Sequence, residues 1–487
     1  MRNPDIAAPQ FQRALGPLDA TMIVIGSMIG SGIFIVSADI ARTVGGGGYL
    51  LLVWLVTGVI TILGALSYGE LAGMLPHAGG QYVYLREAYN PLIGFLYGWT
   101  LFVVIQTGTI AAVAVAFAKF TSVLLPSLGE QTVLLAIGGF RVSAAQVVAI
   151  LSIIVLTAAN LRGIREGKVI QNIFTIAKTT ALLGLIVLAL AIGWNAEIVT
   201  ANLATFWNAV RTQVTEGNIL SLETLTGMGL LAAFGAAMVG SLFSSDAWNN
   251  ITFTAAEVVN PQRTIPLSLF VGTLTVTLIY LLANVAYLAV LPVAGSAGAT
   301  DVLGRGIQFA VNDRVGTAAA TAIFGEGTAV VMALLIMVST FGCNNGLILA
   351  GARVYYAMAR DRLFFTSAGT LNNNGVPAGA LIAQAIWACA LCLSGTYGDL
   401  LDYVVFAVLI FYILTVAGVF ILRRKRPDAP RPYKAFGYPV LPALYIAAAA
   451  AISLNLLVVK PAYTWPGLGL VVLGIPVYFA WARRRAA

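Results

Sequence analysis

Two stretches of small and polar residues interrupt long apolar runs in this chain. The first, 26–34, lies inside the apolar stretch 18–44, and the second, 239–250, lies inside the apolar stretch 227–257. Glycine costs roughly 1 kcal/mol relative to alanine inside a helix, and irregular backbone at membrane depth survives only where it is buried in protein or lines a cavity. A broken helix offers free N–H groups at one new end and free C=O groups at the other, which suit an anion and a cation. The two interruptions are therefore the first candidates for a binding site.

The composition identifies the class of protein that must position these interruptions. The chain of 487 residues is 59% hydrophobic and 9% charged, with a mean hydropathy of +0.91, whereas a soluble domain is about 25% charged. Segments that can cross a hydrocarbon core of about 30 Å are predicted at 18–43, 50–74, 91–122, 143–161, 169–193, 227–257, 266–291, 328–359, 379–396, 400–422, 438–458 and 465–482. We therefore expect an all-α membrane protein with twelve transmembrane helices.

The basic residues indicate the orientation of these spans. Most of the 27 lysines and arginines fall in segments that share a side with both termini, and the basic cluster 423–426 is among them. The positive-inside rule then predicts cytoplasmic termini in a multi-pass protein of the plasma (inner) membrane. The cluster is interpreted as an anchor at the anionic inner leaflet rather than as a nucleic-acid site.

Few residues of this chain suit catalysis or metal binding. Cys343, Cys389 and Cys392 lie in apolar spans, and the single histidine, His77, has no companion ligand. No metal site and no cofactor is predicted. An enzyme needs a convergent set of acid, base or metal ligands, and a channel needs repeated pore-lining rings. A carrier is the favoured class, and a channel or a membrane-embedded enzyme is the remote alternative.

The spacing of the two interruptions suggests an internal repeat. They lie five spans apart, as do the corresponding discontinuous helices of secondary transporters that are built from two inverted halves. Because each half holds an odd number of spans, the second half is inserted upside down. The predicted organisation is a cytoplasmic segment 1–17, a first repeat 18–193, an extracellular loop 194–226, a second repeat 227–422, and a basic loop with helices eleven and twelve and a short basic C-terminus at 423–487.

Six motifs, in order along the chain, carry a resemblance to a known family: they are 26–34, 68–71, 79–89, 260–266, 353–361 and 431–434. On these motifs the chain resembles amino acid permeases of the amino acid–polyamine–organocation superfamily, and the L-type amino acid transporters are the nearest branch. The resemblance implies a five-plus-five inverted repeat, with helices one and six discontinuous, that moves amino acids by alternating access.

The resemblance also implies where an amino acid would bind. A substrate carboxylate should meet the backbone and hydroxyl around Ser31 and Gly32, and its ammonium should meet carbonyl groups near Met28, Phe243 and Asp246. Phe243 matches an aromatic residue that caps the substrate from outside in this family, while Thr109, Val113, Asn249, Val404 and Phe406 match side-chain pocket positions more loosely. The substrate-binding residues expected on this basis are Met28, Ser31, Gly32, Ile33, Thr109, Val113, Phe243, Ser244, Asp246, Asn249 and Phe406. An alternative remains open: the glycines of the first interruption serve only close helix packing.

Asp246 leaves the substrate class open. A carboxylate at mid-membrane depth is a functional candidate by default, because its insertion costs about 2.5–3.5 kcal/mol. It can select a cationic amino acid or polyamine, orient a small polar substrate, or cap free N–H groups of the break. We favour neutral L-amino acids because the other pocket positions are apolar or uncharged, and a cationic amino acid or polyamine carrier is the alternative.

Lys178 is the second charge predicted within a span. Its ammonium needs acceptors, and the carbonyl groups freed by the first interruption can supply them. By the resemblance, this lysine replaces the sodium ion that sodium-coupled transporters of the same architecture hold between helices one and eight. The prediction is sodium-independent exchange or proton symport, with Lys178 as a brace for helix one and a candidate carrier of the coupled proton. The other interpretation is a lysine that snorkels to the cytoplasmic interface.

The expected partners are the amino acid substrate and the lipid bilayer. In animal relatives an ancillary glycoprotein is attached through a cysteine in the loop after the third helix, but residues 123–142 of this chain contain no cysteine. We therefore expect no disulfide-linked ancillary subunit, and a homo-oligomer is left open.

Overall fold

The computed structural model describes residues 10–137, 140–215, 218–394 and 397–486. Most of the predicted N-terminal segment 1–17 lies outside these residues. The first half contains α1 (Pro17–Met28), α2 (Gly32–Ile35), α3 (Ser37–Val44), α4 (Gly47–Met74), α5 (Gln81–Ala88), α6 (Pro91–Thr100), the π-helical turn η1 (Leu101–Ile105), α7 (Gln106–Leu124), η2 (Pro126–Leu128), β1 (Val133–Ile137), β2 (Phe140–Ser143), α8 (Ala144–Asn160) and α9 (Ile164–Ala191).

The rest of the chain continues the helical pattern. It contains α10 (Ala196–Ala204), β3 (Val210–Thr215), β4 (Asn218–Thr224), α11 (Gly227–Ser244), α12 (Asn250–Phe253), η3 (Ala255–Glu257), α13 (Pro261–Val290), α14 (Val302–Arg305), η4 (Val311–Asp313), α15 (Val315–Phe324), α16 (Thr328–Arg360), η5 (Thr366–Gly369), α17 (Ala378–Cys392), α18 (Tyr397–Lys425), α19 (Val440–Val459) and α20 (Pro461–Ala486).

The predicted membrane class is confirmed, while the number of spans is confirmed only in part. Within the described residues, 10 helical segments are long and apolar enough to cross a membrane. The predicted spans 143–161 and 379–396 correspond to α8 and α17, which have 17 and 15 residues and are shorter than the roughly 20 residues that a bilayer requires.

The all-α prediction is wrong in one respect, because the chain contains two antiparallel β-hairpins. Strands β1 and β2 pair within the connection between α7 and α8, and β3 and β4 pair within the predicted loop 194–226, which also contains α10. Short amphipathic strands at the ends of long apolar helices are easily hidden in sequence by the stronger helical signal.

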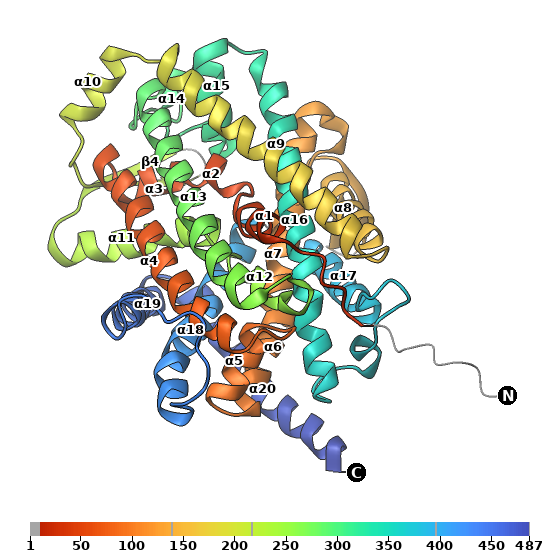
Figure 1. Cartoon of the computed structure of the whole chain (residues 1–487). Coiled ribbons are helices and arrows are strands. Elements are labelled where there is room, and N and C mark those ends of the chain that lie inside the picture. Colours follow the sequence, from red (N-terminus) through yellow and green to blue (C-terminus); the bar gives the residue numbers. More distant parts are fainter. Residues whose placement is uncertain (1–9, 138–139, 216–217, 395–396, 487) are drawn as a thin grey trace.

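The helices form one bundle, and the first interrupted helix lies inside it. Figure 1 shows α1 and α2 between α13 and α16, while α10, α14 and α15 gather at the end of the bundle far from α20. Helix α1 packs on α9, α13 and α16, and α2 contacts α11. The N-terminal helix is thus enclosed by parts of both predicted repeats.

Both predicted interruptions are real breaks in the helices, and both are shorter than the sequence motifs. Helix α1 ends at Met28, Ile29 takes an extended conformation, and helical backbone resumes at Gly32. Helix α11 ends at Ser244, and Ala247 has a φ of +63°, which an L-residue with a side chain rarely adopts. The two helices are therefore interrupted at 29–31 and again at 245–249.

Candidate functional site

Lys178 of α9 reaches the carbonyl groups of the first break. Its ammonium lies 2.5 Å from the carbonyl oxygens of both Gly26 and Ile29 and 3.3 Å from that of Ser339. The residue is 1% exposed, so this charge is held by backbone dipoles rather than by water. The contact differs from that of a snorkelling lysine, whose ammonium reaches the interface.

Side chains of α13 and α16 engage the other carbonyl groups of the first break. The hydroxyl of Ser339 donates to Gly30 O at 3.0 Å, and the thiol of Cys343 donates to Ser27 O at 3.0 Å. The hydroxyl of Tyr280 lies 3.0 Å from Met28 O. Together with Lys178, these donors give every carbonyl from Gly26 to Gly30 a side-chain partner, which satisfies polar groups that lipid would leave unpaired.

Tyr280 links the two breaks directly. Its hydroxyl oxygen lies 3.0 Å from Met28 O, at the end of α1, and 3.0 Å from Ser244 O, at the end of α11. The Tyr280 ring is buried against Trp54 in an edge-to-face arrangement. The carbonyl ends of two half-helices therefore converge on one hydroxyl group in the core of the bundle.

The glycines of the first break also allow close packing. A Cβ atom at Gly32 would lie 1.9 Å from the Ser244 hydroxyl oxygen, and one at Gly26 would lie 2.0 Å from the amide of Gln171. The packing role that the sequence left open is therefore present at both positions. Gly32 brings the start of α2 against the end of α11, so the same glycine also joins the two breaks.

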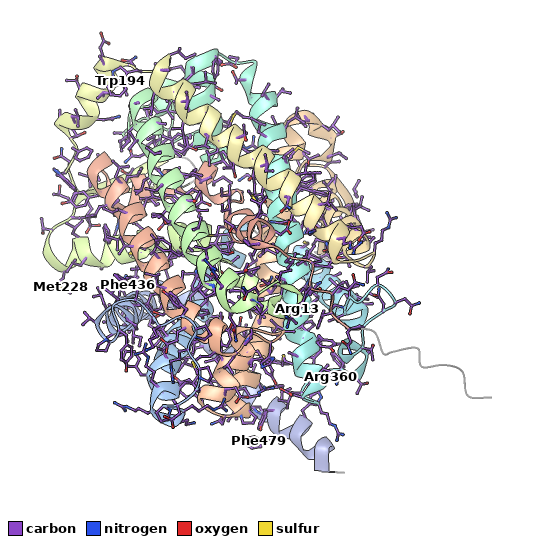
Figure 2. The ribbon with its side chains drawn as sticks, in the orientation of Figure 1. Arg13, Trp194, Met228, Arg360, Phe436 and Phe479 are labelled. Atoms are coloured by element: carbon purple, nitrogen blue, oxygen red, sulfur yellow. The ribbon has the colours of Figure 1, made fainter. Side chains whose placement is uncertain are left out.

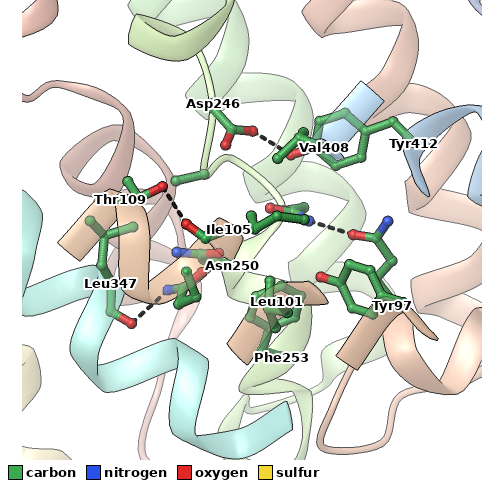
Figure 3. Close-up of a pocket in the computed structure, with 14 residues that line it drawn as sticks. Tyr97, Leu101, Ile105, Thr109, Asp246, Asn250, Phe253, Leu347, Val408 and Tyr412 are labelled. Atoms are coloured by element: carbon green, nitrogen blue, oxygen red, sulfur yellow. Dashed lines mark hydrogen bonds between the residues drawn. The ribbon is translucent and has the colours of Figure 1, made fainter. Parts of the chain in front are cut away.

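A cavity lies beside the second break, between α12, α18 and the π-helical turn η1 (Figure 3). Its free space is about 10 Å³, about what one water molecule needs, so the lining residues close tightly around it in this structure. Asp246 and Tyr412 lie at one end in Figure 3, and Leu101 and Phe253 lie at the other. The Tyr412 hydroxyl donates to the Asp246 carboxylate at 2.5 Å. A second cavity, with a free space of about 20 Å³, borders the same two residues on the side of Trp248 and Tyr445.

Amide side chains line the remaining polar part of the cavity. Asn249 donates to Gln81 at 2.8 Å, Gln81 donates to the Thr415 hydroxyl at 3.0 Å, and Gln106 donates to Leu347 O at 2.8 Å. The motif at 79–89 positions Gln81 through glycines with positive φ. At Gly80, with φ +42°, a Cβ atom would lie 2.4 Å from the Thr252 hydroxyl, so a glycine is needed to bring this turn against α12.

The expected binding residues fall into three groups. Thr109, Asp246 and Asn249 line the cavity of Figure 3, although the Thr109 hydroxyl donates to Ile105 O of its own helix. A second group forms the two breaks and the buried contact between them: Met28, Ser31, Gly32, Ile33 and Ser244. The remaining residues are buried among the core side chains but are not part of the lining of that cavity: Val113, Phe243, Val404 and Phe406.

Sequence reasoning missed several polar side chains of this site. Gln81 lies in a recognised motif but was given no role, whereas Gln106, Tyr280 and Tyr412 lie in apolar runs with no pattern that marks them. The π-helical turn Leu101–Ile105 faces the cavity, and such turns are often found at functional sites. A glutamine or tyrosine inside a predicted span is the only signal that the sequence offered.

Ion pairs hold together the end of the bundle where most of the motifs meet. Arg353 forms a two-pronged pair with Glu257 at 2.8 Å, and both side chains are 1% exposed. Glu70 is contacted by Arg423 at 2.6 Å and by Arg431 at 3.3 Å. Residues far apart in the chain are thus joined in two groups of ion pairs.

Comparison with known proteins identifies the family. A family profile described as amino acid permease matches residues 15–477. The chain belongs to this family. The permease is 29% identical over 475 residues to the large neutral amino acids transporter small subunit 2 of Mus musculus, covering 96% of this chain and 81% of that protein.

The permease is also similar to two further transporters over nearly its whole length. It is 28% identical over 480 residues to the serine/threonine exchanger SteT of Bacillus subtilis, with 98% of both chains covered. It is 27% identical over 494 residues to the b(0,+)-type amino acid transporter 1 of Mus musculus, with 99% of this chain and 91% of that protein covered. These relatives are amino acid transporters, so the carrier class is confirmed, and the family points away from an enzyme.

Proposed function

We propose that this permease is a sodium-independent secondary carrier of neutral L-amino acids in the plasma membrane, working by exchange or proton symport. The observation that carries the proposal is the convergence of two helix breaks on Tyr280, with the Lys178 ammonium on the neighbouring carbonyl groups of Gly26 and Ile29. The N–H groups at the start of α2 suit a carboxylate, and the carbonyl ends of α1 and α11 suit an ammonium.

Sodium independence follows from what Lys178 occupies. Its ammonium lies among the carbonyl oxygens of Gly26, Ile29 and Ser339, which are the kind of oxygen ligands that a hard cation would use. A cation that belongs to the protein leaves no place for sodium there. Lys178 also braces helix one and is a candidate for the coupled proton.

The proposed architecture is the twelve-span, five-plus-five inverted repeat with both termini cytoplasmic. It is supported by the matched breaks near the starts of segments 18–193 and 227–422. The loop 194–226 would then be extracellular, and 423–487 would hold the last two helices. Residues 123–142 lack a cysteine, so the permease is proposed to need no disulfide-linked subunit.

Transport in proteoliposomes tests this proposal. Uptake of a labelled neutral amino acid should be accelerated by unlabelled amino acid inside the vesicle and should not depend on a sodium gradient. Uptake that requires a sodium gradient would refute the role of Lys178. Uptake that is indifferent to internal substrate and does not saturate would indicate a channel instead.

A cationic substrate is the second candidate, and Asp246 is the observation that favours it. Its carboxylate borders both cavities, where a cationic side chain could reach it. A thermal-shift screen with the twenty amino acids on wild type, Asp246→Gly and Tyr412→Phe distinguishes the candidates. If Asp246 selects cations, only Asp246→Gly loses stabilisation by arginine and lysine, because Tyr412→Phe retains the carboxylate.

A further inference from the structure

A wide groove outside the transport pathway runs along one side of the bundle. Its free volume is about 900 Å³, at the upper end of the roughly 300–1,000 Å³ typical of small-molecule sites. Helices α4 and α13 form two of its walls, and the segment 432–436 before α19 forms the third. The groove is lined by apolar side chains and by one cationic side chain, that of Arg263, which suits an amphiphile rather than a compact solute.

The third wall is fixed rather than loosely attached. The Tyr433 ring packs on α4, where a Cβ atom at Gly69 would lie 2.8 Å from it, and a hydrogen bond of 2.7 Å joins the Ala435 amide to the buried Glu70 carboxylate. Glu70 is also paired with Arg423 and Arg431. The groove is therefore preformed by the folded protein.

One face of α13 gives the groove a charged end and an apolar end. Arg263, Leu267 and Phe270 follow the i, i+4, i+7 spacing that places residues on one face of a helix. All three are exposed, Leu267 by 51% and Phe270 by 39%. From Arg263 to Phe270 the groove extends roughly 10 Å along the helix axis, with its charge at the end of the helix and its apolar wall further in.

This spacing matches the depth profile of a bilayer leaflet. Helix α13 has 30 residues, about 45 Å at 1.5 Å per residue, so its first turn reaches the headgroup region of a bilayer about 40–45 Å thick. Arg263 then lies at headgroup depth, and Phe270 lies in the hydrocarbon. Within the described part of the chain, the Arg263 guanidinium forms no ion pair, so its charge is available to a ligand.

From these observations we infer that the groove, defined by Leu66, Arg263, Leu267, Phe270, Tyr433 and Phe436, binds one anionic phospholipid of the adjacent leaflet. The phosphate pairs with Arg263, and an acyl chain lies along Leu267, Phe270 and the exposed Phe436. This site lies outside the breaks and the cavity of Figure 3, and it does not depend on which amino acid is carried.

Native mass spectrometry of the purified full-length protein tests this assignment. Phosphatidylglycerol and phosphatidylcholine with identical acyl chains are titrated separately, and the affinities for the first bound lipid are compared. A single basic residue near a membrane surface contributes enough for roughly a fivefold preference. Wild type should therefore favour phosphatidylglycerol by roughly this factor, and Arg263→Gln should abolish the preference.

Two further variants make the result specific. Arg360→Gln removes an equally exposed arginine at the end of α16, far from Phe436 in Figure 2, and should leave the preference unchanged. Phe270→Ala should weaken the binding of both lipids. The assignment is overturned if wild type binds the two lipids equally, if Arg263→Gln keeps the preference, or if Arg360→Gln removes it as well. Because lipid binding is measured without transport, failure here leaves the proposed carrier function untouched.

Discussion

Replacement of Lys178 by methionine tests the account of the first break most directly. The substitution keeps most of the side-chain volume and removes the donor. It leaves Gly26 O without its side-chain partner, while Ile29 O keeps only the Ser339 hydroxyl at 3.4 Å. Each buried carbonyl left unsatisfied costs about 1–3 kcal/mol. Because only Gly26 O loses its side-chain partner altogether, we take the middle of this range, about 2 kcal/mol, which corresponds to roughly thirtyfold more frequent local opening.

Hydrogen exchange of the segment 29–36 measures that opening. The amide groups of Ile29, Phe34 and Val36 are hydrogen-bonded on either side of the break, so their exchange should accelerate by roughly thirtyfold in Lys178→Met. The melting temperature is a poorer readout, because removal of a buried charge also relieves its desolvation penalty. Binding of amino acids should be lost in the same variant.

Lys168→Met is the matched control. Lys168 lies in the same helix and donates to Ala14 O at 2.8 Å and to the Asp19 carboxylate at 3.0 Å, so it also contacts the α1 region. Its removal should leave exchange at 29–36 unchanged. If Lys178→Met exchanges at the wild-type rate, the ammonium does not stabilise the break, and the reasoning is refuted.

Three other substitutions probe the contacts described above. Tyr280→Phe removes the hydroxyl shared by the two breaks and should weaken amino acid binding about fivefold or more in a thermal-shift titration, since a neutral hydrogen bond contributes about 1 kcal/mol. Arg353→Met leaves the Glu257 carboxylate buried and unpaired and should destabilise the protein by about 3–5 kcal/mol in thermal unfolding, whereas the double variant with Glu257→Gln should recover part of the loss. At the membrane surface, burial raises the pKa of Glu87, but hydrogen bonds from Arg426 and a neighbouring arginine outweigh it and hold the pKa below its ordinary value. This stabilisation is present above the unfolded-state pKa and is lost as the pH falls through the folded-state pKa, so Glu87→Gln should flatten the acid side of the melting-temperature profile.

Each of these three has an outcome that contradicts it. Wild-type affinity in Tyr280→Phe would mean that the hydroxyl does not shape the site. An Arg353→Met protein as stable as wild type would show that the ion pair is replaceable by solvent. An unchanged acid profile in Glu87→Gln would assign acid sensitivity to other carboxylates.

The sequence predicted the features that leave a local signature. Composition and apolar segments identified the membrane class, and the clusters of small and polar residues located both breaks. An intramembrane lysine needs acceptors, and the freed carbonyl groups were the nearest supply, so the contact of Lys178 could be anticipated. Each of these inferences uses residues close together in the chain, or a charge whose requirements are strict.

The lateral contacts could not be predicted in the same way. Tyr280 and Tyr412 lie in apolar runs where an aromatic residue is ordinary, and only the packing of α13 and α18 turns their hydroxyl groups toward the breaks. The π-helical turn before Gln106 and the two β-hairpins left no periodic signal. Val113 and Phe406, which were expected in the pocket, are buried and are not among the residues that line the cavity of Figure 3.

The Tyr280 hydroxyl faces two carbonyl oxygens but can donate only one hydrogen. A phenol carries a single hydrogen, yet two carbonyl oxygens stand at the same distance of 3.0 Å from it. When the hydroxyl donates to one of these oxygens, the other receives no hydrogen bond from Tyr280. The two acceptors therefore share one donor. Under the proposed function, a substrate amine with several hydrogens supplies the missing hydrogen bond, and this contributes part of the free energy of substrate binding.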